Sequence, residues 1–214
     1  MARLHAPTES TAWVGRLLIA STARVRPDRR AKAITVLQPV APLGGGPMSL
    51  LVTGVRRDRG GQLWVRVMLP VRPNGTQGWV RGNAFRFVRT PLRVVVDQTD
   101  RRLTLYRSGR VLLRVPVAVG KAETPTPTGR FAVAELIRTR TKGAFLGPIV
   151  FPLTGYSRVL NEYAGGDGRV AMHGTSLPAL IGTRASHGCI RIRNQDVVRL
   201  SRLVRPGTPV TIRW

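Results

Sequence analysis

The sequence predicts a mainly β protein built from two successive β-rich units, with one or two short helices. Short apolar runs alternate with clusters of Gly, Pro and Asn along most of the chain, which is typical of strands joined by turns. The pattern resets around Thr90-Pro91, and only residues 194–204 carry an apolar stripe at helical spacing. The 214 residues suffice for two modest units, each with its own core.

Residues 1–20 are predicted to form an N-terminal tail, and residues 21–90 the first β unit. The apolar stretch Trp13–Ala23 is short for an export signal and contains an arginine, so a leading β-strand is the preferred interpretation. Four β-type runs follow: Ala33–Val40, Leu50–Arg56, Leu63–Leu69 and Gly78–Arg81. Such runs are typical of a small all-β barrel or sandwich. Trp64 and Trp79 fit core packing, with a ligand platform as the alternative.

Residues 91–214 form the second predicted unit. The runs Leu92–Asp97, Arg102–Arg107 and Val111–Val119 predict an antiparallel meander, and Phe131–Ile137 a further strand. Residues 120–129 contain two prolines and predict a loop. Residues 138–165 lack a clean period and mix Gly, Pro and aromatic side chains, including Tyr156. This stretch predicts an irregular lid or substrate wall, with plain structural packing as the alternative.

The C-terminal part predicts a strand, a helix and a closing strand. Residues 169–172 form the first strand, and Asn194 is a good N-cap for the helix. The helix has an apolar stripe of Val197, Leu200, Leu203 and Val204. Pro206-Gly207 ends it, and Pro209–Trp214 predicts the closing strand.

The composition limits the classes of partner. The formal net charge is +25, yet the basic residues occur singly, and neither a zinc-finger spacing nor an aromatic RNA-binding signature is present. Specific nucleic-acid binding is therefore not predicted. Anionic wall polymers, anionic lipid and a merely solvated surface remain open. No run of about 18 apolar residues occurs, so the chain is not predicted to span a membrane.

The only cysteine, Cys189, lies close to two of the three histidines, His173 and His187. A thiol needs a partner that activates it at neutral pH, and an imidazole serves either as a base or as the cation of an ion pair. A Gly-rich turn and a strand would deliver His173, and a short crossing returns the chain to Cys189. We therefore predict Cys189 as a nucleophile and His173 as its base, with no cofactor.

Gly188 would let the chain turn sharply before Cys189 and let a substrate carbonyl approach. Main-chain N–H groups at that turn could stabilise an oxyanion, each by about 2.7–4 kcal/mol. Two alternatives stay open: an ordinary turn, and a zinc site that adds Asp167 or Asp196 to these residues. Only His187 and Cys189 have a metal-like spacing, so no metal is predicted.

Two groups of motifs resemble known families. The sequences His173-Gly174-Thr175 and Ser186-His187-Gly188-Cys189-Ile190-Arg191, with Asn194 and Asp196 after them, resemble the L,D-transpeptidase family of the YkuD type. Thr124–Gly129 is similar to that family's loop, and the resemblance covers roughly residues 91–214. Trp64, Pro73-Asn74-Gly75 and Gly78-Trp79-Val80 resemble bacterial SH3-like modules. The implied fold is a small SH3-like β-barrel followed by an L,D-transpeptidase β-sandwich with one or two short helices.

The resemblance implies a peptidoglycan L,D-transpeptidase that forms 3→3 cross-links. Cys189 would attack the third residue of a stem tetrapeptide and release D-Ala, and an amine of a second stem would resolve the thioester. His173 would be base and then acid, the Gly174 carbonyl would orient its ring, and His187 would support the site. The N–H groups of Gly188 and Cys189 would form the oxyanion hole. The implied substrate-binding residues are Ser186, Gly188, Arg191 and Tyr156.

The resemblance also implies a biological setting. The partners would be peptidoglycan stem peptides and anionic wall polymers, and the chain would be a monomer in the cell wall or periplasmic space. Its roles would be cell-wall organisation and cell shape, and carbapenems would target it. Three departures stand out: Asn replaces Arg191 in some members, a strongly aromatic lid is lacking, and an export signal is not evident. The alternatives are an L,D-carboxypeptidase and a non-catalytic wall- or polyanion-binding protein.

Overall fold

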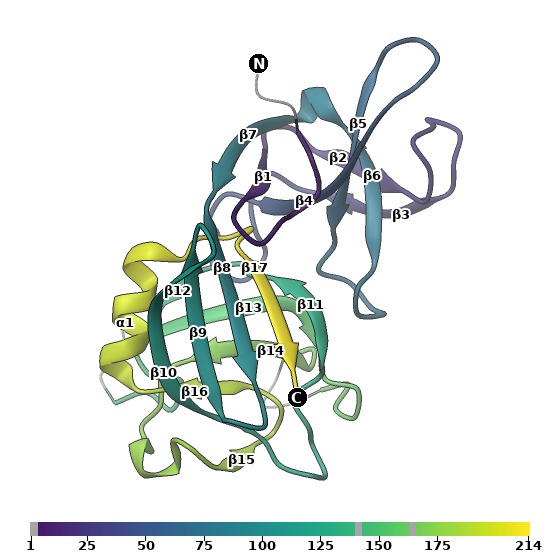
Figure 1. Cartoon of the computed structure of the whole chain (residues 1–214). Coiled ribbons are helices and arrows are strands. Elements are labelled where there is room, and N and C mark those ends of the chain that lie inside the picture. Colours follow the sequence, from purple (N-terminus) through teal and green to yellow (C-terminus); the bar gives the residue numbers. More distant parts are fainter. Residues whose placement is uncertain (1–3, 140–142, 163–165) are drawn as a thin grey trace.

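The computed structural model describes residues 4–139, 143–162 and 166–214, which form two separate β-sheets (Figure 1). The first sheet has the strand order β3-β2-β6-β5-β4-β1-β7, all antiparallel. Its strands are β1 (Ala12–Leu17), β2 (Ser21–Arg24), β3 (Ala33–Leu37), β4 (Ser49–Arg57), β5 (Leu63–Met68), β6 (Gln77–Arg81) and β7 (Phe85–Thr90). We call residues 12–90 the first sheet unit.

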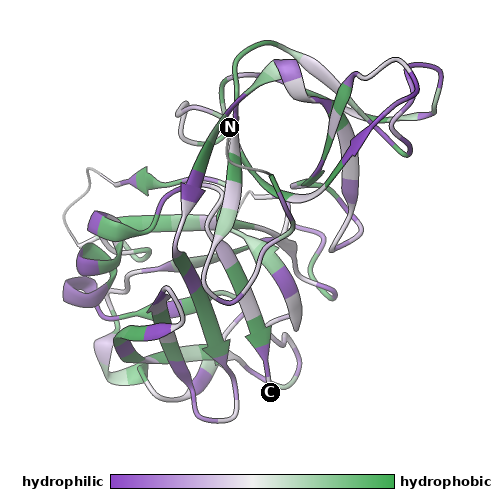
Figure 2. Ribbon diagram, turned by 45° about the horizontal axis from the view of Figure 1, so that its top comes forward, coloured by the Kyte–Doolittle hydropathy of each residue, from purple (hydrophilic) through white to green (hydrophobic). Residues whose placement is uncertain are grey.

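The first sheet unit is strongly curled, so that alternate apolar side chains meet in one core (Figure 2). Val52 of β4, Val65 and Val67 of β5 and Val80 of β6 are all fully buried in it. The predicted tail is shorter than residues 1–20, because β1 pairs with β4 on one side and β7 on the other. The preferred interpretation of residues 13–23 as a leading strand is confirmed for their first part, Trp13–Leu17.

The second sheet contains 10 strands in the order β11-β17-β8-β9-β10-β16-β14-β13-β12, with β15 paired to β10. The strands are β8 (Leu92–Asp97), β9 (Arg102–Arg107), β10 (Arg110–Gly120), β11 (Gly129–Ala132), β12 (Ile137–Arg138), β13 (Ile149–Tyr156), β14 (Arg169–His173), β15 (Arg184–Ser186), β16 (Ile190–Ile192) and β17 (Pro209–Arg213). Figure 1 shows β8 and β9 in front of β13 and β14. Val96 and Leu105 share one core with Phe151 and Met172, as in a sandwich.

The prediction of an irregular stretch over residues 138–165 is wrong for its central part. Residues 149–156 form β13, every residue of which is buried. The strand was not predicted because it contains Pro152 and Gly155, and both residue types usually interrupt strands. Here Pro152 lies beside a register shift, and Gly155 is required because the ring of Phe131 occupies the space of a β-carbon. Residues 140–142 and 163–165 of the predicted lid lie outside the described residues.

The predicted helix is present as α1 (Asn194–Leu203), which buries Val197 and Leu200 against the sandwich. Two short 3-10 helices, η1 (Gly82–Ala84) and η2 (Pro178–Leu180), complete the helical content of the described residues. The N-cap is Arg193, so the prediction for Asn194 is wrong by one position. Across the described residues, none of the helices has the length and apolar character that a membrane span requires.

Candidate active site

The parallel pair β14–β16 brings the predicted catalytic residues to one face of the second sheet. Met172 is in register with Ile190, and His173 with Arg191. Cys189 directly precedes β16, two positions before Arg191. Because alternate residues of a strand face the same side, Cys189, Arg191 and His173 project from one face. The imidazole and the sulfur are therefore diagonal neighbours, although 16 residues separate them along the chain.

The His173 ring is fixed in one orientation and held neutral. The ring is 2% exposed, and Nδ1 donates to the Gly174 carbonyl at 2.5 Å. A carbonyl only accepts, so the proton is on Nδ1 and Nε2 is left with its lone pair. Burial and, to a smaller degree, the charge of Arg191 lower the pKa of His173 to about 4, while the carbonyls of Gly174 and Leu146 oppose this shift. At neutral pH the ring is a base.

Cys189 is half-buried and its thiol is protonated at rest. Burial raises the pKa of the thiol, while the Ala171 main chain and the charge of Arg191 oppose that effect. With His173 neutral as well, the pair is thiol and imidazole, which favours the base interpretation over the ion pair. The hydrogen bonds of the described residues do not join Sγ to His173. Catalytic hydrogen bonds are often long in the absence of substrate, so this absence leaves the assignment of His173 as the base unchanged.

The turn before Cys189 is held by the side chain of Ser186. Its hydroxyl donates to the Cys189 carbonyl at 2.6 Å and accepts from the Gly188 N–H at 3.2 Å. Gly188 has φ +110°, a left-handed conformation that favours glycine. The Gly188 N–H is thus engaged within the turn, whereas the sequence analysis assigned it to the oxyanion hole. Of the two predicted donors, the Cys189 N–H is the one that this bond leaves available.

Arg191 is a buried cation without a counter-charge among the described residues. It is 5% exposed, and its Nε has no hydrogen-bond partner. Its guanidinium carbon lies 4.9 Å from the centroid of the Phe145 ring, and Phe145 in turn lies beside His173 at 6.5 Å between ring centroids. A buried charge is costly unless it is paired. The arrangement therefore suits a ligand that brings a carboxylate next to Cys189.

A cavity of about 570 Å³ joins these groups. Its polar lining includes His173, Ser186, His187, Cys189 and Arg191, whereas much of the rest is apolar. The apolar residues are Leu43, Ile137, Phe145, Leu146, Val150, Pro152, Leu160, Val170 and Ala171. The size and mixed lining are typical of a site for a small peptide.

Tyr156, predicted to bind substrate, does not line this cavity. It is 5% exposed, and its hydroxyl donates to the Pro70 carbonyl at 2.6 Å and accepts from Arg169 at 2.7 Å. Burial raises its pKa. The structure thus places Tyr156 at the contact between the two sheet units, behind the cavity wall.

Asn194 supports the base His173, a role that was not predicted from the sequence. The Asn194 carboxamide accepts from the Thr175 N–H at 2.8 Å. A β-carbon on Gly174 or Gly147 would overlap this carboxamide, so the three residues pack without spare room. Asn194 therefore holds the segment whose carbonyl orients His173. The Asn-x-Asp sequence after the cysteine motif was the available signal, and it was interpreted as a helix cap.

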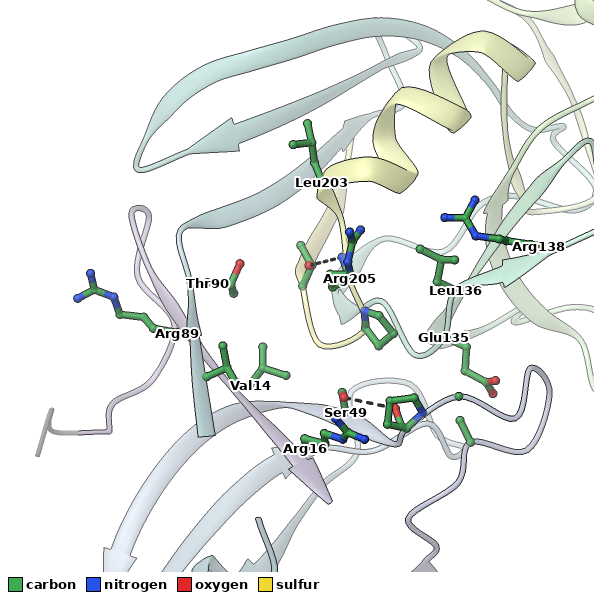
Figure 3. A pocket seen from close by; sticks show the side chains of 16 residues that line it. Val14, Arg16, Ser49, Arg89, Thr90, Glu135, Leu136, Arg138, Leu203 and Arg205 are labelled. Atoms are coloured by element: carbon green, nitrogen blue, oxygen red, sulfur yellow. Dashed lines mark hydrogen bonds between the residues drawn. The ribbon is translucent and has the colours of Figure 1, made fainter. Parts of the chain in front are cut away.

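A second cavity, of about 580 Å³, lies between the two sheet units (Figure 3). None of the predicted site residues lines it. Its arginines come from separate elements and, as Figure 3 shows for Arg89 and Arg138, do not converge on one point. Within the described ranges, no group of three His, Cys, Asp or Glu side chains is placed to hold a metal ion.

Comparisons with known proteins agree with this geometry. Residues 91–212 match the YkuD family, described as the L,D-transpeptidase catalytic domain. The chain is 38% identical over 122 residues to the L,D-transpeptidase YkuD of Bacillus subtilis, covering 57% of this chain and 66% of that protein. It is 34% identical over 134 residues to the L,D-transpeptidase ErfK/SrfK of Salmonella typhimurium, covering 56% of this chain and 43% of that protein.

The chain thus spans less than two thirds of these relatives' own length. A solved L,D-transpeptidase from Mycobacterium smegmatis is 18% identical, with a TM-score of 0.44, over 92% of this chain and 100% of that one. The family match covers more than half of the 214 residues and includes the β14–β16 pair with its cysteine and histidine. The chain belongs to the YkuD family of L,D-transpeptidase catalytic domains.

Proposed function

We propose that the protein is a peptidoglycan L,D-transpeptidase that forms 3→3 cross-links through a thioester on Cys189. The observation that carries the proposal is one cavity that joins a thiol and a neutral imidazole to Arg191, a buried cation with no counter-charge among the described residues. Stem peptides are rich in carboxylates, and their cross-linking requires acyl transfer. Such transfer needs a nucleophile, a base and a charge partner, and no cofactor.

The first half of the reaction acylates the enzyme. Nε2 of His173 takes the thiol proton while Sγ bonds to the carbonyl carbon of the third stem residue. The developing oxyanion is stabilised by the Cys189 N–H, which is the remaining donor of the predicted pair. The bond from that carbon to the nitrogen of the terminal D-alanine then breaks. His173 returns the proton to the leaving amine, so the imidazole is neutral again.

The second half transfers the acyl group to an amine of another stem peptide. The amine attacks the thioester, and His173 accepts its proton. The carbon–sulfur bond breaks, and the thiolate recovers the proton from the imidazole. A base whose pKa is about 4 is weak, so its driving force for proton transfer is small. We propose that two features compensate for this small driving force: the fixed orientation of the His173 ring, and the charge of Arg191, which favours the thiolate.

Arg191 is the proposed anchor for a substrate carboxylate. Its guanidinium offers donors in a fixed fork that suits a carboxylate, and its burial strengthens the interaction. Ser186 shapes the turn, and His187 lines the cavity beside the sulfur. Tyr156 has a positioning role in the proposal, because its hydroxyl is engaged outside the cavity.

The setting of the reaction follows from the substrate. We propose that the chain acts outside the cytoplasm as a monomer, with residues 12–90 as an SH3-like accessory domain and residues 91–214 as the catalytic domain. The formal net charge of +25 supports a weaker association with anionic wall polymers. Such an association would bring the enzyme to its substrate and would weaken as salt is raised.

Incubation with purified disaccharide tetrapeptides tests the proposal directly. The wild-type chain should yield cross-linked dimers and free D-alanine by mass spectrometry, and Cys189→Ala should yield neither, a loss of at least about 10³-fold. A carbapenem should add its own mass to the wild type and nothing to Cys189→Ala. Tripeptide without dimers would replace the proposal by carboxypeptidase action. Salt-sensitive polyanion binding with no product of either kind would indicate a binding protein.

A further inference from the structure

The first sheet unit contributes a side chain to the catalytic cavity. Leu43 lies in the turn between β3 and β4 and lines the cavity that contains Cys189, although it is 53% exposed. The N–H groups of Leu43 and Gly44 donate to the two carboxylate oxygens of Glu135, at 3.1 Å and 2.6 Å. Glu135 is 4% exposed and belongs to the second sheet unit; Figure 3 shows it at the boundary of the two units. Leu43 is therefore held in place across the boundary.

A second contact from the first sheet unit holds the opposite side of the cavity. We call the described residues 156–162 and 166–169 the wall segment; Ser157, Leu160 and residues 166–169 of it line the cavity. The guanidinium of Arg72 donates to the carbonyls of Ser157, Leu160 and Asp167, at 2.9, 3.2 and 3.1 Å. Its carbon also lies 4.7 Å from the centroid of the Tyr156 ring. The Arg72 side chain thus hydrogen-bonds to both parts of the wall segment, residues 156–162 and residues 166–169.

Asn74 pairs with the start of the wall segment as a neighbouring strand would. Its Nδ2 donates to the Tyr156 carbonyl at 2.8 Å, and its Oδ1 accepts from the Tyr156 N–H at 2.8 Å. The Tyr156 hydroxyl adds the bond to the Pro70 carbonyl. These partners are 82 to 86 residues apart in the chain, so the shape of the wall depends on the first sheet unit being docked.

We propose that the first sheet unit is part of the substrate-binding pocket, with Leu43 contacting bound peptide and Arg72 and Asn74 acting as positioning residues for the wall segment. The inference rests on the proposed function and deepens it. The cavity is cationic beside Cys189, where Arg191 lies, and apolar around Leu43 and Ile137. Leu43 accordingly packs against the aliphatic carbons of a stem-peptide side chain, while the carboxylate lies at Arg191.

The physical reason for the positioning role is an equilibrium between wall conformations. Without Arg72, three carbonyls of the wall segment lose their common donor and are free to turn toward water. The fraction of molecules with a binding-competent wall then falls, and the apparent affinity falls in proportion. His173 ends β14 and Cys189 directly precedes β16, so we expect their reactivity not to depend on the bonds of Arg72.

Leu43→Ala tests the contact with substrate, with Leu18→Ala as the matched control. Leu18 is 52% exposed in the same unit and does not line the cavity. Leu43→Ala removes part of an isobutyl group that bound substrate would bury, so KM should rise roughly fivefold in this variant. The kcat of this variant should stay within about twofold, since the reacting groups are untouched. An unchanged KM, or an equal change in Leu18→Ala, would overturn the contact.

Arg72→Ala tests the positioning role, with Arg66→Ala as the matched control. Arg66 also lies over an aromatic ring, that of Trp79, and hydrogen-bonds to Thr53, all within the first sheet unit. Arg72→Ala should raise KM about tenfold with little change in kcat, because the loss of bonds to a charged donor is typically 1.5–3 kcal/mol. Arg72→Lys should recover part of the loss, as a point charge cannot reach three carbonyls at once.

Two further readouts separate this inference from the proposed function. Alkylation of Cys189 by iodoacetamide should proceed at the same rate in all these variants, which shows that the thiol is intact. Calorimetric binding of tetrapeptide to the same variants in the Cys189→Ala background should reproduce the KM pattern. If tetrapeptide binding follows the predicted KM pattern but the wild type transfers no acyl group, only the proposed function is rejected. If the wild type transfers the acyl group but the Leu43 and Arg72 variants have the same KM as their controls, only the inference is rejected. Absence of tetrapeptide binding to the parent chain would reject both.

Discussion

The floor and the wall of the catalytic cavity are built in different ways. The floor is the face of β14 and β16 that carries His173, Cys189 and Arg191, and the sheet hydrogen bonds between adjacent strands set its geometry. The wall consists of residues 156–162 and 166–169, and its shape depends on side chains that donate to its carbonyls from 82 to 95 residues away. Reactive groups thus occupy the regular part of the fold, and the surface that selects substrate occupies the irregular part.

The difference separates chemistry from recognition. A strand pair tolerates little displacement, so the imidazole, thiol and guanidinium keep their relative places whatever the first sheet unit does. We expect the wall to change conformation when it loses one of these bonds, because loops exchange main-chain partners for water at small cost. Changes in the floor should therefore act on kcat, and changes in the wall on KM. The predictions below run from the largest expected effect to the smallest.

His173→Gln should lower kcat by about 10²–10⁴-fold while KM stays within a few-fold. Glutamine can still bond to the Gly174 carbonyl but cannot take the thiol proton. Steady-state kinetics with tetrapeptide donor and a saturating amine acceptor measure both constants. A loss of less than tenfold in kcat would mean that another group is the base, and the distinction between floor and wall would then fail.

The free energy of unfolding should fall on acidification because of His173, a residue of the floor. The pKa of His173 is about 4 in the folded chain and near 6.5 when the residue is solvated. The unfolded chain therefore binds a proton first as the pH falls. The free energy of unfolding has its full value above about pH 6.5. It falls by about 3 kcal/mol as the pH approaches 4.

Urea unfolding at pH 7 and pH 4 measures this change as a difference between variants. His173→Gln should lose about 3 kcal/mol less than the wild type on acidification, because its side chain does not titrate. Arg72→Ala should lose as much as the wild type. An equal loss in wild type and His173→Gln would show that the imidazole is not buried in the neutral form.

Tyr156→Phe should have the smallest effect, a slightly lower stability and a small rise in KM, with kcat unchanged. It removes the hydroxyl that donates to the Pro70 carbonyl and accepts from Arg169, while the ring remains under Arg72. The expected loss is about 1 kcal/mol, or a Tm lower by roughly 2–4 °C. Thermal unfolding and transfer kinetics check it together. A fall in kcat of tenfold or more would place this tyrosine in the chemistry and not in the contact between the units.

Local sequence predicted most of the strands, the helix and the reactive groups. The alternation in residues 92–97 and 102–107 predicted β8 and β9 at their observed bounds, because one buried face imposes a period of two. The motif around Cys189 led to the right strand pair, because both segments are short and close in sequence. Residues 149–156 were not predicted as a strand, since the reasons for Pro152 and Gly155 lie in a register shift and in the ring of Phe131.

The sequence by itself predicted which groups are reactive: one thiol, one nearby imidazole and one arginine. Tertiary structure decided how they are used. Burial, which no local pattern reports, makes the His173–Cys189 pair neutral and leaves Arg191 without a counter-charge in the part of the chain that the structure describes. The fold also decided that Ser186 accepts from the Gly188 N–H, that Leu43 lines the cavity, and that Arg72 and Asn74 hold its wall. Such contacts join residues that only the folded chain brings together, so their pairing has no signature in the local sequence.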